Sequence, residues 1–386
     1  MGHIVKIESK REQTGSRKVS RYRANWRDPE GRQRAQTFRT EKEARDHIAV
    51  MEGARAQGRY VDPAGGRMTV SDYLDHWQTT RHVRPSTAAQ QETHIRLHVK
   101  PHIGHLQIGK VRRSHLQSWV GELAVKPSQK AGARKGACLS PRTIEVIYNI
   151  ASCMFREAVR DRIIPASPCD RVALPKPDPV ELRILEPEQV GALVEAMDPR
   201  YRALIVLTVA TGLRQGEVFG LRLRAIPMPY KRLTVAEQVV TLKGGPQLTT
   251  RLKTPASHRT VPVPAFAWEA VSRHLRDYLS DDVIFQSPEG GLIRRGRFHE
   301  RFWKPAHAAA GLPSSVTFHS LRHTYAATLI AEGLHPKVIQ SRLGHASIVE
   351  TMDTYGHLFP DADEQTTAAI ERRIAASVGA VALAGG

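Results

Sequence analysis

The sequence predicts an α+β chain of three domains: a small N-terminal β-sheet with one helix, an all-α domain, and a mainly α domain with a three-stranded antiparallel sheet. Its 386 residues, of which 41% are apolar, suit two or three globular domains. Strand-like alternation is confined to two separate stretches, and apolar residues at helical spacing fill most of the rest. We therefore place the domains at residues 1–62, 63–178 and 179–386.

The N-terminal domain is defined by segments that alternate or are rich in β-forming residues, with a DPEG turn signal between two of them. A helical pattern follows, and Thr40 with Glu43 is placed to form a capping box at its start. A β-ribbon that carries arginines can enter a DNA groove, so arginines on these strands are candidate DNA contacts. The expected elements are strands at 3–8, 20–27 and 33–39 and a helix at 41–56, and the candidate contacts are Arg21, Arg23, Arg27 and Arg34.

The second domain reads as entirely helical, and a proline-rich segment, PASPCDRVALPKPDPVE, separates it from the third. Between its last two helices lies a basic, glycine-containing loop at 126–140. This loop supplies three more candidate DNA contacts, Lys130, Arg134 and Lys135. The expected helices are 70–77, 84–99, 112–123 and 140–164.

Four histidines of this domain are spaced like metal ligands: His94, His98, His102 and His105. We expect Pro101 to break the helix between the second and the third of them, so that the four do not share one face. No cysteine or carboxylate completes a ligand set in the sequence pattern. Surface or DNA-facing histidines are therefore favoured over a metal site.

The charge of the chain points to a polyanionic partner. Its net charge is +19, and the sequence divides this into +6 over 1–62, +9 over 63–178 and +4 over 179–386. Such an asymmetry favours nucleic acid as the partner over a merely soluble basic surface. No long apolar run, few cysteines and no nucleotide-binding glycine loop are present, so we expect a cytoplasmic protein that neither enters a membrane nor uses ATP.

The third domain mixes helices with three predicted strands, and four short motifs stand out in it. Arg214 follows an apolar helix that ends at Gly212, and its simplest role is a salt bridge to Glu217. Lys253 lies at the end of a strand, where most lysines are solvated, and Lys243 on a neighbouring strand competes with it. The expected helices are 186–197, 200–211, 215–222, 265–279, 297–310, 319–332, 335–343 and 347–354, and the expected strands are 232–240, 247–253 and 259–264.

The remaining two motifs carry histidines, an arginine and a tyrosine. His319 and Arg322 are three residues apart and share a helix face at its N-terminal end, where phosphate binds well. His323, one step round, is expected to be structural. In LGHASIVETMDTYGHL, His345 follows a helix that ends in glycine, and Tyr355 falls near the end of the next helix. An ordinary half-buried aromatic is the simple alternative for this tyrosine.

Taken in order, the stretches ATGLRQGE, FHSLRHTYA and LGHASIVETMDTYGHL resemble the motifs of the tyrosine recombinases, the phage integrase family. The resemblance is strong over roughly 180–375, moderate over 63–178 and weak over 1–62. It implies an N-terminal arm-binding domain, a helical, SAM-like core-binding domain and a catalytic domain. The substrate would be double-stranded DNA with core and arm attachment sites.

The resemblance also implies a role for each site residue. Tyr355 would attack a DNA phosphorus and form a 3′-phosphotyrosyl link, and because the bond energy is retained, rejoining needs no ATP. Arg214 and Arg322 would hold the phosphate, and Glu217 would orient Arg214. Lys253 would protonate the leaving 5′-oxygen, His319 is the candidate general base, and His345 would bond a phosphate oxygen. No metal or other cofactor is expected.

Two departures and the tail complete the comparison. Ser320 stands where many relatives have aspartate, and the segment after the first arginine motif lacks the usual polar turn residues. In the tail, Ile370, Ile374 and Val378 recur at helical spacing, so an amphipathic helix is expected to dock on a neighbouring protomer in a tetramer, or else on its own chain.

The resemblance favours an integrase of a phage or other mobile element, aided by an excisionase or a host DNA-bending protein. Three alternatives stay open: a chromosome-dimer-resolving recombinase, a type IB topoisomerase and a catalytically silent DNA-binding regulator. A predicted arm-binding sheet argues against the first of these, and a complete set of catalytic residues argues against the last.

Overall fold

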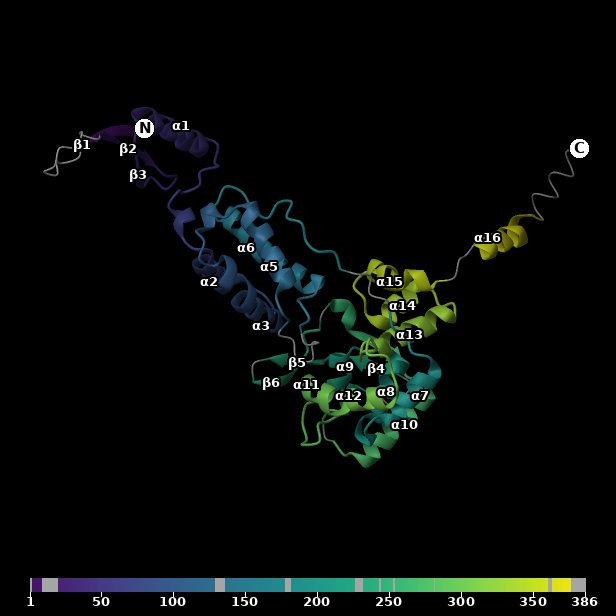
Figure 1. The fold of residues 1–386 in the computed structure, drawn as a ribbon. Helices are drawn as coiled ribbons and strands as arrows, with labels where there is room; N and C mark the ends of the chain where they lie inside the picture. Colours follow the sequence, from purple (N-terminus) through teal and green to yellow (C-terminus); the bar gives the residue numbers. More distant parts are fainter. Residues whose placement is uncertain are drawn as a thin grey trace, which may run out of the picture. The chain divides into compact units, whose positions relative to one another are not determined.

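The computed structural model divides the chain into two compact units, Met1–Pro179 and Val180–Gly386. Figure 1 labels the helices and strands of each unit. The structure describes residues 2–8, 20–128, 136–177, 182–225, 232–242, 244–252, 254–280, 282–359 and 363–375.

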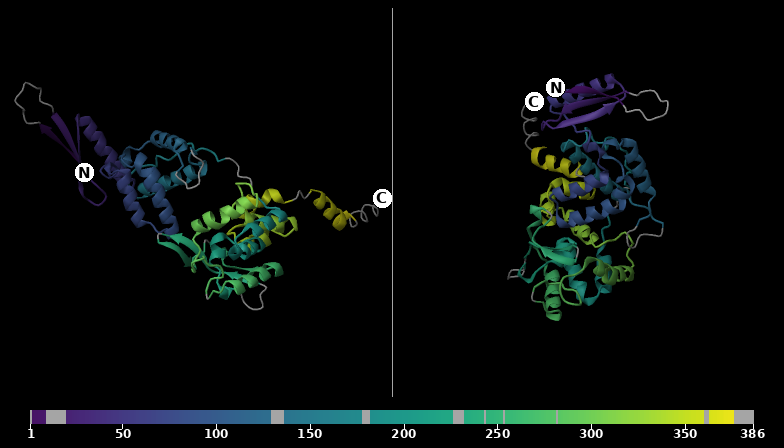
Figure 2. Two further views of the ribbon diagram at one scale, coloured as in Figure 1. Left: turned by 60° about the horizontal axis from the view of Figure 1, so that its bottom comes forward. Right: turned by 90° about the vertical axis from the view of Figure 1, so that its left-hand side faces the viewer.

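The first unit opens with an antiparallel sheet in the order β1-β2-β3, followed by helix α1. On the central strand, Ala24 and Trp26 turn toward α1, where Ala44 and Ile48 complete a small core. Arg21, Arg23 and Arg27 alternate with them and are exposed on the strand's other side, as the two-residue period requires. Figure 2 shows α1 lying along one face of the sheet. The elements are β1 (His3–Glu8), β2 (Ser20–Arg27), β3 (Gln33–Phe38) and α1 (Glu41–Ala56).

The start of α1 confirms the predicted capping box. The backbone N–H of Glu43 donates to Thr40 Oγ1 and that of Thr40 donates to Glu43 Oε2, both at 3.2 Å. Two of the helix's unpaired N-terminal donors are thereby satisfied, which fixes where the helix begins.

The rest of the first unit is helical and packs around the most amphipathic of its helices, α6. Ile147, Ala151, Met154 and Phe155 on one face of α6 are completely buried. The elements are a 3₁₀ turn (Gly65–Arg67), α2 (Val70–Thr80), α3 (Pro85–His94), a π-helical turn (Ile95–Val99), α4 (Lys100–Ile103), a 3₁₀ turn (Ile108–Lys110), α5 (Arg113–Val125) and α6 (Pro141–Arg160).

The prediction that Pro101 breaks the helix is wrong. Helical structure runs from Pro85 to Ile103 because the π-helical turn precedes the proline, whose missing N–H then falls in the first turn of α4. The same arrangement recurs at Pro305, after a second π-helical turn. Among the histidines, His98 is buried while His102 pairs with Glu122 at 2.7 Å.

The second unit is built on a large apolar core around α8, of which Leu204, Ile205 and Leu207 are almost fully buried. A smaller cluster joins α13, α14 and α15 through Ile330, Ile339 and Tyr355. The helices are α7 (Pro187–Ala196), α8 (Pro199–Thr211), α9 (Gln215–Phe219), α10 (Ala265–Asp277), α11 (Arg295–Phe298), a π-helical turn (His299–Trp303), α12 (Lys304–Ala309), α13 (Ser320–Ala331), α14 (Pro336–Leu343), α15 (Ile348–Tyr355) and α16 (Asp363–Ile370). Four further 3₁₀ or π turns lie among the described residues at Leu223–Ala225, Pro255–Ser257, Gly356–Leu358 and Glu371–Ala375.

The predicted three-stranded sheet of this unit is wrong, because the described strands form two separate two-stranded ladders, β4 with β7 and β5 with β6. The segment expected as one strand divides at Glu237, whose carboxylate pairs with Arg222 and Arg224 at 2.9 and 3.0 Å. After that break, β5 turns back on β6 in a tight hairpin at Gly244, where φ is +99° and glycine is favoured. The strands are β4 (Arg232–Val235), β5 (Gln238–Leu242), β6 (Gly245–Thr249) and β7 (Arg259–Pro262).

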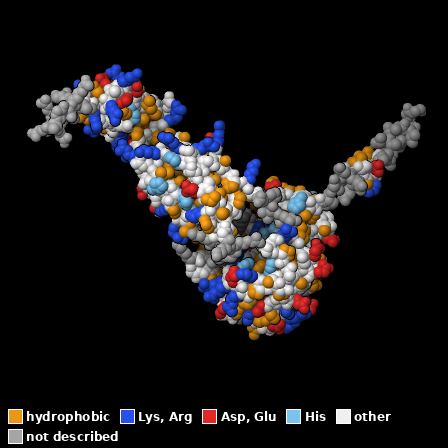
Figure 3. All heavy atoms as spheres, in the orientation of Figure 1, with side chains coloured by type: hydrophobic (Ala, Val, Ile, Leu, Met, Phe, Trp, Pro, Cys, Tyr) orange, Lys and Arg blue, Asp and Glu red, His pale blue; other side chains and the backbone are white. Residues whose placement is uncertain are grey.

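In the part of the chain that the structure describes, no helix is both long and apolar enough to cross a membrane. Figure 3 shows Lys and Arg side chains spread over the first unit, whereas Asp and Glu side chains gather along one side of the second.

Candidate active site

The site begins where α8 ends. Gly212 closes this helix at φ +64°, and a Cβ at this position would lie 2.3 Å from the ring of Tyr325, so only glycine fits. Arg214 then occupies the N-cap of α9. The sharp turn places the Arg214 side chain beside the helix end rather than out in solvent, and the side chain is 22% exposed.

Arg214 is held by the buried carboxylate of Glu217, as the sequence predicted for this pair. Arg214 Nη1 donates to Glu217 Oε1 at 3.0 Å, and the backbone N–H of Arg214 donates to Oε2 at 2.9 Å. Arg259 on β7 binds the same carboxylate from the other side, with Nη1 at 3.1 Å and Nη2 at 2.8 Å. Glu217 is therefore shared by two arginines.

The charge of this trio favours anion binding. Burial alone would raise the pKa of Glu217, but the hydrogen bonds and charge of Arg259, with the charge of Arg214, hold it below its ordinary value. One carboxylate then faces two guanidinium groups, so the trio keeps a net positive charge. Because Arg259 is buried and Arg214 is partly exposed, that charge is available at Arg214.

Arg322, on the first turn of α13, lies deeper, with only 2% of its surface exposed. Its Nη1 donates to the carbonyl of Gly212 at 2.9 Å and its Nη2 to that of Leu343 at 2.7 Å. Burial and repulsion from Arg214 and Arg259 lower its pKa to about 9, which leaves it protonated at neutral pH. Three of its five N–H donors are not used by these two bonds.

The two arginines meet at the end of α14. Arg322 binds the carbonyl of Leu343, and Arg214 Nη2 donates to the next carbonyl, that of Gly344, at 3.2 Å. Gly344 adopts φ +66°, and a Cβ there would lie 2.9 Å from the carbonyl oxygen of Ala256. This left-handed turn thus orients two successive carbonyls and brings the cations together.

Tyr355 ends α15 against these cations and is only 1% exposed. Its Oη lies 2.9 Å from Nδ1 of His323, and its ring stacks on that of His345, with 6.4 Å between centroids. Burial raises the pKa of the hydroxyl, and the charges of Arg322 and Arg214 oppose that rise. The tyrosine is therefore protonated at neutral pH but lies in the field of both arginines.

Two further histidines, His345 and His319, lie near this pair of His323 and Tyr355. His345 is buried, and its Nδ1 lies 2.8 Å from Thr351 Oγ1. His319 is exposed at the N-cap of α13, and its ring stands edge-on to that of His323 at 4.7 Å. Desolvation, His323 and both arginines lower the pKa of His319 to about 4. The structure therefore brings Arg214, Glu217, His319, Arg322, His345 and Tyr355 into one site.

Other candidates from the sequence are not gathered here. Lys253, Lys130, Arg134 and Lys135 lie outside the described residues. Arg21, Arg23 and Arg27 are exposed on the N-terminal sheet. Arg34 differs from them, because its guanidinium pairs with Asp28 at 3.1 Å and Asp62 at 2.7 Å.

Two contacts of the site were not expected from the sequence. His323, expected to be structural, touches the tyrosine hydroxyl, and its spacing of four residues from His319 places both on one helix face. Arg259 lies two residues before the buried Val261 on β7 and so shares its face, and this strand period was the signal for an inward-pointing arginine.

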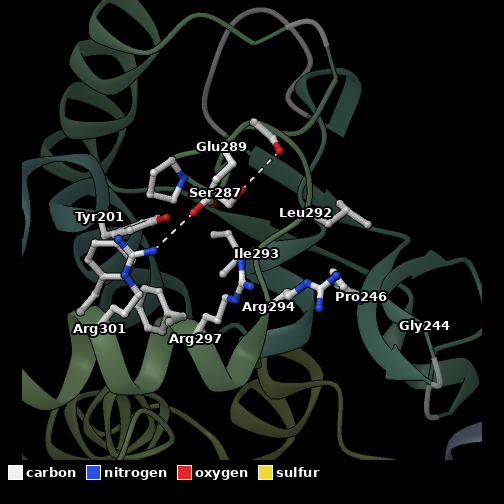
Figure 4. Close-up of a pocket in the computed structure, with 14 residues that line it drawn as sticks. Tyr201, Gly244, Pro246, Ser287, Glu289, Leu292, Ile293, Arg294, Arg297 and Arg301 are labelled. Atoms are coloured by element: carbon white, nitrogen blue, oxygen red, sulfur yellow. Dashed lines mark hydrogen bonds and ion pairs between the residues drawn. The ribbon is translucent and has the colours of Figure 1, made fainter.

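A separate hollow of about 430 Å³ lies in the second unit and contains none of these candidates. Tyr201, Phe298 and Phe302 line it together with Arg294, Arg297 and Arg301 (Figure 4). Arg301 pairs with Glu289 at 3.3 Å. The chemistry of the tyrosine site is therefore not located in this hollow.

Comparisons with known proteins identify the family of the chain. Residues 183–361 match the phage integrase family, and residues 69–124 match the phage integrase N-terminal SAM-like domain. The chain is 27% identical over 337 residues to a XerC-like tyrosine recombinase of Caldanaerobacter subterraneus subsp. tengcongensis (79% of this chain, 82% of the relative). It is 30% identical over 217 residues to XerD of Pseudomonas aeruginosa (53% of this chain, 67% of the relative).

Among solved structures, the Tn1549 transposon integrase in complex with a circular intermediate DNA aligns with a TM-score of 0.65 at 22% identity, over 79% of this chain and 99% of that one. This likeness shows the fold of the second unit, which is mainly helical with small antiparallel ladders. The chain belongs to the phage integrase family of tyrosine recombinases and is a site-specific DNA recombinase.

Proposed function

We propose that the chain cleaves and rejoins DNA through a 3′-phosphotyrosyl intermediate at Tyr355, and so integrates or excises a phage or other mobile element. The observation that carries the proposal is the convergence of Arg214 and Arg322 on successive carbonyls beside the Tyr355 hydroxyl. A phosphodiester between these cations would have its non-bridging oxygens neutralised as negative charge develops on them.

The proposed reaction keeps atoms and charge in balance. Tyr355 Oη gives up its proton to a histidine of the site and forms a bond to phosphorus, while the bond from phosphorus to the 5′-oxygen breaks. Lys253 supplies the proton that the leaving 5′-oxygen needs, by resemblance to the family. The reverse step, with a 5′-hydroxyl from another strand, releases the tyrosine and joins the DNA, so no external energy source is required. His345 would bond a phosphate oxygen, and Glu217 orients Arg214.

We propose that residues 1–62 bind arm sites, that residues 63–178 bind the core site, and that residues 179–386 carry out catalysis, in the cytoplasm. Exposed Arg21, Arg23 and Arg27 on one side of β2 support the first assignment. The match of 69–124 to a SAM-like integrase domain supports the second.

A homotetramer on DNA is proposed from the C-terminal segment. Ile370 and Ile374 are 54% and 46% exposed on α16 and the turn that follows, although both are apolar. Docking of this face on a neighbouring protomer would bury it, and packing on the same chain is the alternative. Val378 lies outside the described residues. An excisionase or a host DNA-bending protein would set the direction of the reaction.

A second candidate within the same chemistry is chromosome-dimer resolution, which the XerC-like and XerD relatives favour. The N-terminal sheet argues for the mobile-element reading, because it lies outside both family matches and presents arginines. A catalytically silent regulator is disfavoured, because a pure DNA-binding protein has no need of a buried tyrosine between cationic groups.

The test is covalent trapping without metal or ATP. Duplexes that the full chain selects from a random pool would be nicked so that the short 5′-hydroxyl fragment diffuses away after cleavage. We expect a protein–DNA adduct stable to SDS in the presence of EDTA, and its rejoining when a 5′-hydroxyl strand is added. Tight binding without any adduct would instead support the silent regulator.

A further inference from the structure

We propose that His323 is the group that accepts the proton of the Tyr355 hydroxyl during attack on the phosphate. The inference rests on the proposed function above and deepens it, because it assigns the proton-accepting step to one side chain. It also separates His323 from His319, the residue that the family resemblance favours for this step.

The contact itself is direct. His323 Nδ1, on α13, lies 2.9 Å from Tyr355 Oη at the end of α15, and the rings meet at 63° with 5.7 Å between centroids. Because Tyr355 is 1% exposed, bulk water cannot reach the hydroxyl to take its proton. The acceptor must therefore be a group that is already within the site.

His319 is less well placed for this role. It is exposed, its ring is edge-on to His323, and no hydrogen bond joins it to Tyr355 in the described part of the site. It occupies the N-cap of α13, and a helix N-terminus favours a bound phosphate.

The charges around His323 make its basicity depend on whether a phosphate is bound. Burial, then the charge of Arg322, lower the pKa of His323 to about 4, so the ring is neutral and free to accept a proton. A phosphate bound at Arg322 would offset that charge and raise the pKa of His323 just when a base is needed. The groups that face His323 are His319 and Arg322 on its own helix and Tyr355 on α15.

In the proposed step, the proton moves from Tyr355 Oη to His323 Nδ1 as the bond from Oη to phosphorus forms and the bond to the 5′-oxygen breaks. Nε2 carries the other ring proton, so that Nδ1 presents a lone pair. During rejoining, His323 returns the proton to Oη as the tyrosine leaves. No co-reactant is needed.

The test measures the single-turnover rate of adduct formation by the full chain, with two versions of the selected nicked duplex. One carries the natural 5′-oxygen, and the other a bridging 5′-sulfur, whose thiolate leaves without being protonated. His323→Gln keeps a hydrogen-bond acceptor but cannot accept a proton. The comparison variants are His319→Gln, Lys253→Ala and His357→Gln, the last at an exposed position beyond the tyrosine.

We expect His323→Gln to slow adduct formation by about 100-fold or more on both substrates, because nucleophile activation is lost whichever atom leaves. The sulfur substrate should rescue Lys253→Ala only, and the DNA affinity of His323→Gln should stay near the native value. If His323→Gln folds poorly, His323→Ala with added imidazole gives a second test, since rescue by imidazole requires a missing base rather than a missing fold.

Native rates in His323→Gln, rescue of this variant by the sulfur substrate, or a larger loss in His319→Gln would overturn the assignment. Failure of imidazole to restore His323→Ala would do the same. An absence of adduct in the native protein would have a different meaning, because it would overturn the proposed function itself.

Discussion

The guanidinium of Arg322 donates a hydrogen bond of 2.9 Å to the carbonyl of Gly212, which joins the first turn of α13 to the end of α8. The carbonyl points at Arg322 only because Gly212 adopts a left-handed conformation. The ring of Tyr325 covers the glycine and leaves no room for a side chain. A backbone conformation therefore positions the guanidinium that we propose binds the phosphate.

Gly212→Ala should disturb both stability and cleavage. The left-handed conformation alone costs about 1–2 kcal/mol for alanine, and the collision with Tyr325 adds to this. Gly311→Ala is the matched control, because Gly311 has φ +63° and nothing within 4 Å of its Cβ position. Denaturation and adduct assays should show the backbone cost for both variants, but loss of cleavage for Gly212→Ala only. Equal cleavage by the two variants would contradict the positioning role.

Glu217→Gln should be strongly destabilising, by about 3 kcal/mol or more, because it removes the carboxylate between two buried or half-buried guanidinium groups. Glu269→Gln, in an exposed pair with Arg273, should cost little. Since the folded pKa of Glu217 is lowered, its contribution is present above its unfolded pKa and is lost as the pH falls through the folded value. Denaturant titrations should show that Glu217→Gln removes this loss of stability at acid pH. The same pH dependence of stability in native and variant chains would contradict a stabilising role for Glu217 and its arginine partners.

Several features of the fold were within reach of the sequence. The capping box of Thr40 and Glu43 and the αL end of α8 follow from local rules that act over three or four residues. The pairing of β5 with β6 was missed because it depends on a break in the strand at Glu237. The ion pairs of Glu237 with Arg222 and Arg224 accompany that break, and the sequence does not specify them. The prediction for Pro101 was wrong because a π-helical turn before it compensates for the missing N–H of the proline. No residue pattern in the sequence indicated that turn.

The candidate site likewise combines features that the sequence predicted with contacts that it did not. The order of Arg214, Arg322 and Tyr355 identified the family, because it matches a family motif. The contact between His323 and Tyr355 depends on how α15 packs on α13, which residue order does not specify. The position of Arg259 behind Glu217 likewise joins β7 to α9 across 42 residues.

The N-terminal sheet should contribute to DNA binding through its exposed arginines. Replacing both Arg21 and Arg23 by alanine should weaken binding of short duplexes and lower the slope of log affinity against log salt by about 2, since about one counterion is released per phosphate contact. Arg34→Ala should leave the slope nearly unchanged and instead destabilise the sheet, because it removes the ion pairs of Arg34 with Asp28 and Asp62. An equal slope change in Arg34→Ala would contradict this division.

His98 should make the helical part of the first unit sensitive to acid. Burial, then the charges of Lys126, His94 and His102, lower its pKa to about 4, so from pH 6.5 down to 4 the unfolded state binds a proton that the folded state excludes. Stability should fall by up to about 3 kcal/mol over that window and level off below it. Hydrogen exchange in α5 and α6 should show this loss in the native chain and in the exposed control His105→Gln, but not in His98→Leu. The same acid loss in His98→Leu would assign it to other groups.

The central claim is that Tyr355 is the nucleophile, and the most direct measurement is the identity of the residue that carries DNA in the trapped complex. After nuclease and protease digestion, mass spectrometry should find a nucleotide 3′-phosphate on the peptide that contains Tyr355, and Tyr355→Phe should bind DNA without forming any adduct. A nucleotide on another residue, or an adduct formed equally well by Tyr355→Phe, would contradict the account.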